Sequence, residues 1–156
     1  MAQPGTYRLK NNRGCLRISE EGGFVFLLPE CAADDPIFSV IRDTATHFTM
    51  RGRVVEGQSY CSTGGKNVPV GAPRLDYAAC KVIDTLPAGA TKKPSIPTQQ
   101  FRVEEIGSRP GWYQIVSDAY GKSRCWDVAN PEMSDVYLKP CTNIAAQQFQ
   151  LLPATR

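Results

Sequence analysis

Long hydrophobic runs and clustered positive charge are both missing from this sequence of 156 residues. No apolar stretch approaches the ~20 residues that a membrane-spanning helix needs, so we expect no membrane span. The lysines and arginines are scattered and the formal net charge is only +3, whereas nucleic-acid-binding proteins usually gather their basic residues into a stripe. We therefore expect neither a membrane-spanning nor a nucleic-acid-binding protein.

Motifs for catalysis and cofactor binding are missing as well. The sequence contains no G-x-S-x-G, no H-E-x-x-H, no phosphate-binding G-x-x-x-x-G-K and no dinucleotide-binding G-x-G-x-x-G. His47 is the single histidine and no two cysteines have C-x₂-C spacing, so a zinc site or a histidine general base has little support. We expect no enzyme, no metal and no cofactor.

A signal peptide is not visible either. The first ten residues, MAQPGTYRLK, are polar and contain no apolar core. Either the protein is not exported by the usual route, or this sequence begins at a mature domain. Six cysteines favour the second alternative, because disulfides form and persist in oxidising compartments. We expect a secreted, extracellular protein.

The six cysteines fall into three similar segments. Taken in order as pairs, they enclose 15, 18 and 15 residues. The first cysteine of each pair ends an aromatic-led stretch: GTYRLKNNRGC, THFTMRGRVVEGQSYC and GWYQIVSDAYGKSRC. The second ends an apolar stretch: GFVFLLPEC, PRLDYAAC and SDVYLKPC. Each segment then closes on a phenylalanine, which is Phe38, Phe101 or Phe149.

This repeated order predicts one disulfide in each segment rather than six free thiols. The predicted pairs are Cys15–Cys31, Cys61–Cys80 and Cys125–Cys141. A bridge that closes a loop of this size contributes roughly 3 kcal/mol to stability.

Short strands are the predicted secondary structure. Stretches such as TYRL, FVFLL, WYQIV and FQLL are rich in aromatic or β-branched residues and are bounded by Gly, Pro, Asn or Asp. No stretch keeps a helical period for three turns, and 13 Gly and 12 Pro indicate tight turns. We expect one all-β domain spanning 1–156, with twelve strands in three pseudo-symmetric repeats at about 6–43, 44–106 and 107–153.

Three such units resemble the β-trefoil of the ricin-B (R-type lectin) family. CWDV at 125–128 matches the C-x-D-x stretch of that family, and QQF at 99–101 and 147–149 matches its Q-x-W with Phe in place of Trp. PGTYRLKN is similar to the first strand of fungal β-trefoil lectins and fungal β-trefoil protease inhibitors. The resemblance implies a β-trefoil over about residues 6–152, with Gln99 and Gln147 as structural hydrogen-bonding residues.

The resemblance also implies where a sugar would bind. The family uses a carboxylate, an aromatic face and an amide, which suit hydroxyls and C–H groups. The carboxylate position holds Arg17 in the first repeat, Thr63 in the second and Asp127 in the third. Only the third repeat keeps an acid. Asp127 then has two open interpretations, a sugar ligand or a residue that caps backbone amides, while Trp126 is expected in the core.

The rest of this third-repeat site departs from the family pattern. Lys139 stands where the aromatic is usual, with Tyr137 two residues before it on the same strand face. Ala146 replaces the amide, which leaves Asn143 as the nearest candidate. The carbohydrate-binding hypothesis thus rests on Asp127, Tyr137, Lys139 and Asn143. Lys139 has a second interpretation, as a partner for an acidic sugar or a protein carboxylate.

A long connection in the second repeat suggests another function. From the last cysteine to the closing phenylalanine, the first and third repeats have six and seven residues, whereas the second has twenty. The excess, 87–97, is bounded by prolines and carries Lys92 and Lys93 near its centre. A preordered loop loses less entropy on binding, so this loop could inhibit a protease or bind another host protein. A tolerated surface insertion is the alternative.

The sequence therefore predicts a protein that binds rather than catalyses. The favoured partner is a glycan or glycoprotein, bound at a single degenerate site in the third repeat. The alternative partner is a protease or another protein, bound through surface loops.

Overall fold

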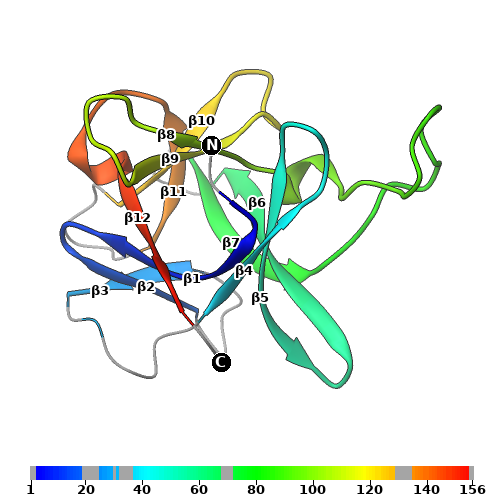
Figure 1. Cartoon of the computed structure of the whole chain (residues 1–156), viewed down its shortest axis with the longest axis horizontal. Coiled ribbons are helices and arrows are strands. Elements are labelled where there is room, and N and C mark those ends of the chain that lie inside the picture. The colour runs from blue at the N-terminus through cyan, green and yellow to red at the C-terminus, as the bar shows by residue number, and fades with distance from the viewer. Residues whose placement is uncertain are drawn as a thin grey trace.

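Figure 1 shows a computed structural model of the chain, in which the described residues are 3–18, 25–29, 31, 37–67, 72–128 and 135–154. They form twelve strands in one sheet and two short 3-10 helices, and none of them is α-helical. The all-β prediction is therefore confirmed. The strands are β1 (Gly5–Asn11), β2 (Gly14–Ile18), β3 (Val25–Leu28), β4 (Phe38–Arg42), β5 (Phe48–Val55), β6 (Gln58–Asn67), β7 (Pro73–Ala79), β8 (Arg102–Glu105), β9 (Trp112–Ser117), β10 (Arg124–Asp127), β11 (Tyr137–Pro140) and β12 (Phe149–Pro153). The helices are η1 (Pro97–Gln99) and η2 (Ala145–Gln147).

The strand pairings close into a ring. The order β12-β9-β10-β11-β7-β6-β5-β4-β1 returns to its start because β1 also pairs with β12. A bridge between Phe48 and Phe101 joins the start of β5 to the residue before β8. Since β8 pairs with β9, this bridge closes a shorter ring of β1, β4, β5, β8, β9 and β12. That shorter ring is a barrel with no open edge.

Three hairpins attach to this barrel, and each contains one disulfide. The hairpins are β2–β3, β6–β7 and β10–β11, and each continues from a barrel strand: β1, β5 or β9. The disulfides are Cys15–Cys31, Cys61–Cys80 and Cys125–Cys141. These are the predicted pairs. Each disulfide joins a cysteine in the first strand of its hairpin to a cysteine that follows the second strand.

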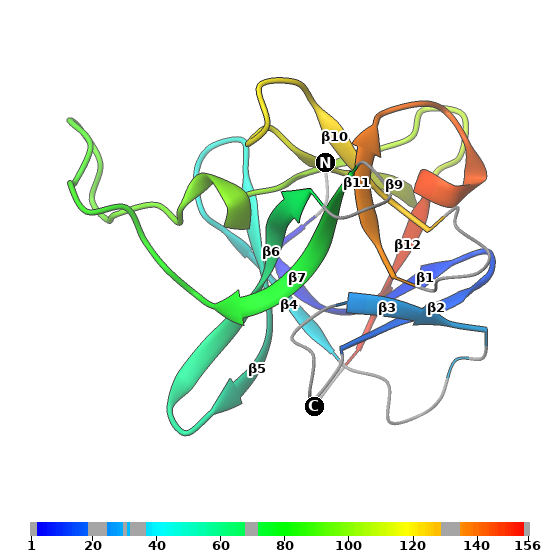
Figure 2. The same cartoon turned by 180° about the vertical axis from the view of Figure 1, so that it is seen from behind.

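The three hairpins also meet one another. The backbone N–H of Leu75 donates to the carbonyl of Val136 at 2.8 Å, and the N–H of Val136 donates to the carbonyl of Val25 at 3.3 Å. All three side chains are buried. One residue from each hairpin thus contributes to a common apolar centre, and Figure 2 shows the hairpin strands β3, β7 and β11 gathered on this side of the molecule.

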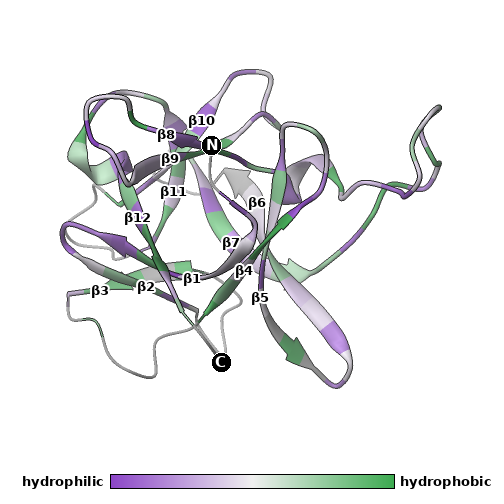
Figure 3. Ribbon diagram, in the orientation of Figure 1, coloured by the Kyte–Doolittle hydropathy of each residue, from purple (hydrophilic) through white to green (hydrophobic). Residues whose placement is uncertain are grey.

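The core contains residues that recur at equivalent positions in the three repeated segments. Phe38, Phe101 and Phe149, which close the three segments, are fully buried. Trp126 is buried too, and it packs edge-on against Phe101 and Phe149 with ring centroids 5.2 Å and 6.3 Å away. Along the strand ribbons, hydrophobic and hydrophilic colours alternate (Figure 3). That alternation matches strands with one buried and one exposed face.

One segment departs from the threefold arrangement. Residues 81–96, here called the arm, connect β7 to η1 and extend away from the barrel in both views (Figures 1 and 2). The arm doubles back on itself, because Ile83 donates to the carbonyl of Pro94 and Ile96 donates to the carbonyl of Lys81. None of the helices among the described residues has the length and apolar character to cross a membrane.

Candidate functional site

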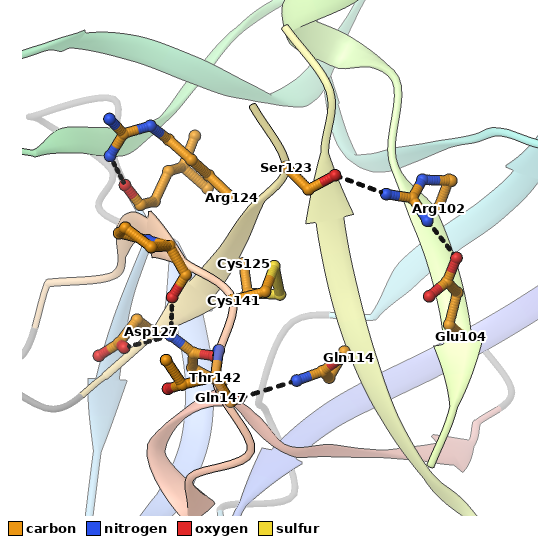
Figure 4. The surroundings of a disulfide bond; sticks show 12 residues. Arg102, Glu104, Gln114, Ser123, Arg124, Cys125, Asp127, Cys141, Thr142 and Gln147 are labelled. Carbon is orange, nitrogen blue, oxygen red and sulfur yellow. Dashed lines mark hydrogen bonds and ion pairs between the residues drawn. A yellow bond between two sulfur atoms is a disulfide. The ribbon is translucent and has the colours of Figure 1, made fainter. Parts of the chain in front are cut away.

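Gln147 organises the end of the third hairpin. Its amide oxygen accepts from the backbone N–H of Thr142 at 2.7 Å. Its amide nitrogen donates to the carbonyl of Pro140 at 3.0 Å and to the carboxylate of Asp127 at 2.8 Å (Figure 4). Gln147 itself is buried. One glutamine side chain therefore ties both residues that flank Cys141 to the end of β10.

Gln99 makes the same set of bonds in the second repeat. Its amide oxygen accepts from the N–H of Lys81 at 2.8 Å, and its amide nitrogen donates to the carbonyl of Ala79 at 2.9 Å. The same nitrogen donates to the hydroxyl of Thr63 at 3.0 Å. Lys81 and Ala79 flank Cys80 as Thr142 and Pro140 flank Cys141. The predicted structural role of the two glutamines is therefore confirmed.

This comparison identifies a structural role for Asp127. Asp127 and Thr63 occupy equivalent positions and each accepts a hydrogen bond from the glutamine of its own repeat. Asp127 is only 2% exposed. The bond from Gln147 comes from a side chain. A hydroxyl from outside reaches this carboxylate only if neighbouring side chains move.

The other residues of the expected sugar site lie at different depths. Tyr137 pairs directly across from Asp127 and is 1% exposed; its burial, followed by the nearby Asp135, raises the pKa of its hydroxyl. Lys139 pairs across from Cys125 and is half-buried. Asn143 is exposed and accepts from the side-chain amide of Gln148 at 3.3 Å. Two of the four residues are thus internal and two lie nearer the surface.

Asn143 lines a polar hollow of about 370 Å³ that leaves out the other three residues. The hollow lies between the β8–β9 strands and the segment after β11. Gln114 spans it, donating to the carbonyl of Thr142 at 3.0 Å, and Glu104 lies beside Gln114 and bonds to Arg102 (Figure 4). The structure therefore brings Asn143 together with Glu104, Glu105 and Gln114, a group that sequence reasoning did not connect.

The arm is fastened to the barrel by Asp43. The carboxylate of Asp43 accepts from the backbone N–H of Ser95 at 3.0 Å, from the Ser95 hydroxyl at 3.1 Å and from the side-chain amide of Gln100 at 2.9 Å. Of the two arm lysines, Lys92 turns back, and its ammonium donates to the carbonyl of Arg42 at 3.2 Å. Lys93 is exposed.

The single histidine belongs to an ionic cluster between the second and third repeats. His47 Nε2 lies 2.9 Å from the carboxylate of Asp118, which also receives two bonds from the guanidinium of Arg102, at 2.8 and 3.0 Å. Hydrogen bonding from Arg102 is the main reason why the pKa of Asp118 lies well below its usual range. The cluster joins the β4–β5 and β9–β10 connections to the start of β8 and offers no isolated base. Among the described residues, no three His, Cys, Asp or Glu side chains gather as metal ligands.

Sequence reasoning also missed two hydrogen-bonded contacts between residues far apart in the sequence, Asp43 with Ser95 and Thr63 with Gln99. Asp43 lies 52 residues before Ser95, and nothing in the local sequence around either residue marks the contact. The Thr63–Gln99 bond had a signal, because Thr63 is aligned with Asp127 and Gln99 with Gln147. That alignment could have predicted the glutamine as the shared partner.

No family model matches the chain, and no curated protein matches it. Solved structures do match in fold. ThreeFoil, a designed threefold symmetric protein, gives a TM-score of 0.63 at 16% identity, over 96% of this chain and 99% of its own. SeviL, solved bound to asialo-GM1 saccharide, gives 0.62 at 14% identity, over 98% and 100%. Both matches cover essentially the whole of each chain.

A third match is the Polyporus squamosus lectin, solved with the human-type influenza-binding epitope Neu5Aca2-6Galb1-4GlcNAc. Its TM-score is 0.61 at 15% identity, over 97% of this chain and 49% of that one. This chain thus spans about half the length of that lectin. At such low sequence identity, structural matches establish the fold alone. These matches confirm the predicted resemblance of the chain to β-trefoil lectins.

Proposed function

We propose that this chain is a secreted β-trefoil that binds carbohydrate and does not catalyse a reaction. The observation that carries the proposal is the fold: almost the whole chain superposes on β-trefoil structures that were solved with bound saccharides. Three disulfides support an oxidising, extracellular location. The partner would be a glycan or a glycoprotein, and the domain would divide into repeats at about 6–43, 44–106 and 107–153.

The proposed sugar site lies in the third repeat. Asp127 would accept hydrogen bonds from two sugar hydroxyls, with Tyr137, Lys139 and Asn143 around it. Asp127 is the one carboxylate at this position in the three repeats, and Gln147 already orients it. Because Asp127 and Tyr137 are buried, a sugar would first contact the more exposed Lys139 and Asn143. Part of the binding energy would then go into moving the side chains that cover the carboxylate.

The decisive experiment is a glycan array with the wild-type protein and Asp127→Thr. The second repeat already has threonine at this position, where Thr63 keeps the bond to its glutamine. The substitution therefore removes the carboxylate and retains the structural hydrogen bond. We expect glycan binding to fall at least tenfold, because a site built on hydroxyl recognition loses its main acceptor. Stability should fall by only about 1 kcal/mol, because the bond from Gln147 then goes to a neutral hydroxyl instead of a carboxylate.

Matched variants locate the site further. Lys139→Ala and Asn143→Ala should weaken binding less, whereas Lys122→Ala, at an exposed lysine outside the four proposed site residues, should leave it unchanged. If a folded wild-type protein binds nothing on a broad array, carbohydrate binding is wrong. If Asp127→Thr binds as well as the wild type, a sugar is bound elsewhere, and the hollow beside Asn143 and Gln114 is the next place to test.

The arm supports a second candidate function, inhibition of a protease or binding of another host protein. Hydrogen bonds from the backbone N–H and the hydroxyl of Ser95 to the carboxylate of Asp43 hold the arm in one position, and a preordered loop binds with a smaller entropy loss. Lys93 is exposed and would enter an acidic specificity pocket. Assays against trypsin-like and papain-like proteases, with Lys92→Ala and Lys93→Ala, test this. Absence of inhibition at micromolar protein would refute the inhibitor hypothesis.

A further inference from the structure

The polar hollow beside Asn143 has the size and the fixed walls of a ligand site. Its volume of about 370 Å³ lies within the range of about 300–1,000 Å³ that is typical of such sites. One wall is formed by β8 and β9, which pair with each other, and the other by the segment after β11. The Cys125–Cys141 disulfide and the bond from the backbone N–H of Thr142 to Gln147 anchor that segment (Figure 4). The polar lining side chains are Glu104, Glu105, Gln114, Thr142 and Asn143, and Ile106 adds an apolar surface.

A relay of side chains fixes which end of the Asn143 amide is available to a ligand. The guanidinium of Arg109 stacks over the ring of Trp112, 3.8 Å from its centroid, and donates to the amide oxygen of Gln148 at 2.5 Å. Because a guanidinium can only donate, Gln148 turns its oxygen to Arg109 and its nitrogen to Asn143. That nitrogen donates to the amide oxygen of Asn143 at 3.3 Å. The NH2 group of Asn143 is then left without a hydrogen bond to any described residue.

Gln114 and Glu104 add acceptors whose orientation is fixed in the same way. The carbonyl of Thr142 can only accept, so its bond of 3.0 Å to Gln114 uses the amide nitrogen of Gln114. The amide oxygen of Gln114 has no partner within the described residues. Glu104 gives one carboxylate oxygen to Arg102, and its second oxygen has none there either. The hollow therefore offers both donors and acceptors, held in place by bonds behind them.

We propose that this hollow is a second sugar site and that it selects a neutral pyranose unit. The proposal rests on the proposed carbohydrate binding, but it does not use Asp127, and Asn143 is the one residue that the two sites share. A sugar hydroxyl can both donate and accept, so neighbouring ring hydroxyls would accept from the NH2 group of Asn143 and donate to Gln114 and Glu104. The C–H groups of the ring would pack on Ile106.

The charges of the lining favour a neutral sugar over an acidic one. Glu104 and Glu105 are carboxylates, and none of the described lining residues is a cation. Arg102 offsets part of the charge on Glu104, but its guanidinium also makes two bonds to Asp118. A carboxylate on the sugar would therefore be repelled at close range.

The test is an NMR titration of the isotope-labelled protein with glucose, galactose and mannose and with the three corresponding uronic acids, each at tens of millimolar. We expect at least one neutral sugar to shift the backbone amide signals of residues 106–107, 114 and 142–143. Its uronic acid should bind more weakly. In Asp127→Thr these signals should still respond, because Asp127 does not line the hollow.

Two exposed positions allow single groups to be removed. Thr142→Val deletes a hydroxyl and keeps the backbone bonds, and Asn143→Asp keeps the oxygen that accepts from Gln148 but deletes the NH2 group. Each should weaken binding by about fivefold, the value of one hydrogen bond. Glu104→Gln should reduce the preference for the neutral sugar over its acid. Glu56→Gln, at an exposed residue between β5 and β6 and outside the lining, should change nothing.

Several results would overturn the proposal. Unchanged signals at the hollow with all three neutral sugars would exclude the site, and equal binding of the uronic acids would exclude selection by charge. Wild-type affinity in both Thr142→Val and Asn143→Asp would place the sugar elsewhere. The glycan array separates this proposal from the broader one. A protein that binds glycans on the array but shows no shifts at the hollow lacks this site alone, whereas a protein silent in both experiments does not bind carbohydrate.

Discussion

The paired glutamines allow one structural prediction to be made with an internal control. Gln147→Ala removes three hydrogen bonds at the end of the third hairpin, and Gln99→Ala removes the three equivalent bonds in the second. Two of the three bonds in each set involve backbone groups near a cysteine. The third differs: Gln147 binds the carboxylate of Asp127, whereas Gln99 binds the hydroxyl of Thr63.

The expected cost follows from these bonds. A neutral hydrogen bond contributes about 1 kcal/mol to stability and a bond to a charged group about 2 kcal/mol. Gln99→Ala should therefore lower the free energy of unfolding by about 3 kcal/mol and Gln147→Ala by about 4 kcal/mol. The difference of about 1 kcal/mol isolates the charge on Asp127. In thermal unfolding, a chain of this size loses roughly 2–4 °C for each kcal/mol.

Urea unfolding at neutral pH with the disulfides intact measures both costs. Gln150→Ala is the matched control, because Gln150 lies on β12 with a half-buried side chain and pairs with its neighbours through the backbone. That substitution should stay within about 0.5 kcal/mol of the wild type. If Gln147→Ala costs no more than Gln99→Ala, the bond to Asp127 carries no extra stability. If both cost as little as the control, the structural role of the glutamines is refuted.

Three further predictions concern single side chains. Hydrogen bonding from Arg102 lowers the pKa of Asp118, so the stability that Asp118 contributes is present above the pKa of about 3.9 of an unfolded chain and is lost as the pH falls below it. The urea unfolding midpoints of Asp118→Asn and the wild type should therefore converge in acid. A difference between the two midpoints that stays constant with pH would contradict this prediction. Burial, with a smaller effect of Asp76, raises the pKa of Tyr120 to about 12, so the stability that Tyr120 contributes should fade as the pH rises from about 10 towards that value. Absorbance titration should show one fewer late-titrating tyrosine in Tyr120→Phe, and an unchanged late phase would refute the assignment. Trp126→Leu should lower the free energy of unfolding by about 2 kcal/mol, measured by thermal unfolding, because the lost core packing is unfavourable. This loss should outweigh the gain from removing an indole N–H that has no acceptor among the described residues. A stabilised variant would mean that the unpaired N–H costs more than the packing contributes.

The repeated pattern of the sequence predicts the elements that the threefold arrangement determines. Phe38, Phe101 and Phe149 recur after each cysteine pair, and all three are buried in the core. Gln99 and Gln147 recur two residues before the last two of them and make the same bonds in both repeats. Each of these roles depends on local sequence and on repetition, and both can be read without coordinates.

Features that depend on contacts between distant segments could not be read in this way. The depth of Asp127 is set by side chains packed around the β10–β11 hairpin, whereas the sequence shows only that it follows a cysteine by two residues. Ser95 contacts Asp43 because the arm folds back onto the β4–β5 turn, and no second copy of that contact occurs among the described residues. The sequence places Lys92 near the centre of a possible inhibitory loop but does not show that its ammonium binds the carbonyl of Arg42. Within the part of the chain that the structure describes, these contacts are not repeated, so the repeated sequence pattern gives no information about them.

The local placement of the disulfides determines what happens when the arm is cut. Cys80 precedes the arm and Cys125 follows it, and every bridge lies wholly on one side. A protease that cleaves between Lys92 and Lys93 would therefore leave two polypeptides without a covalent link. They would be held by the pairing of β1 with β12, the contact of β7 with β11 and the Phe48–Phe101 bridge. The two halves, produced as separate chains, are natural starting points for a split protein whose reassembly reports that its fusion partners have met.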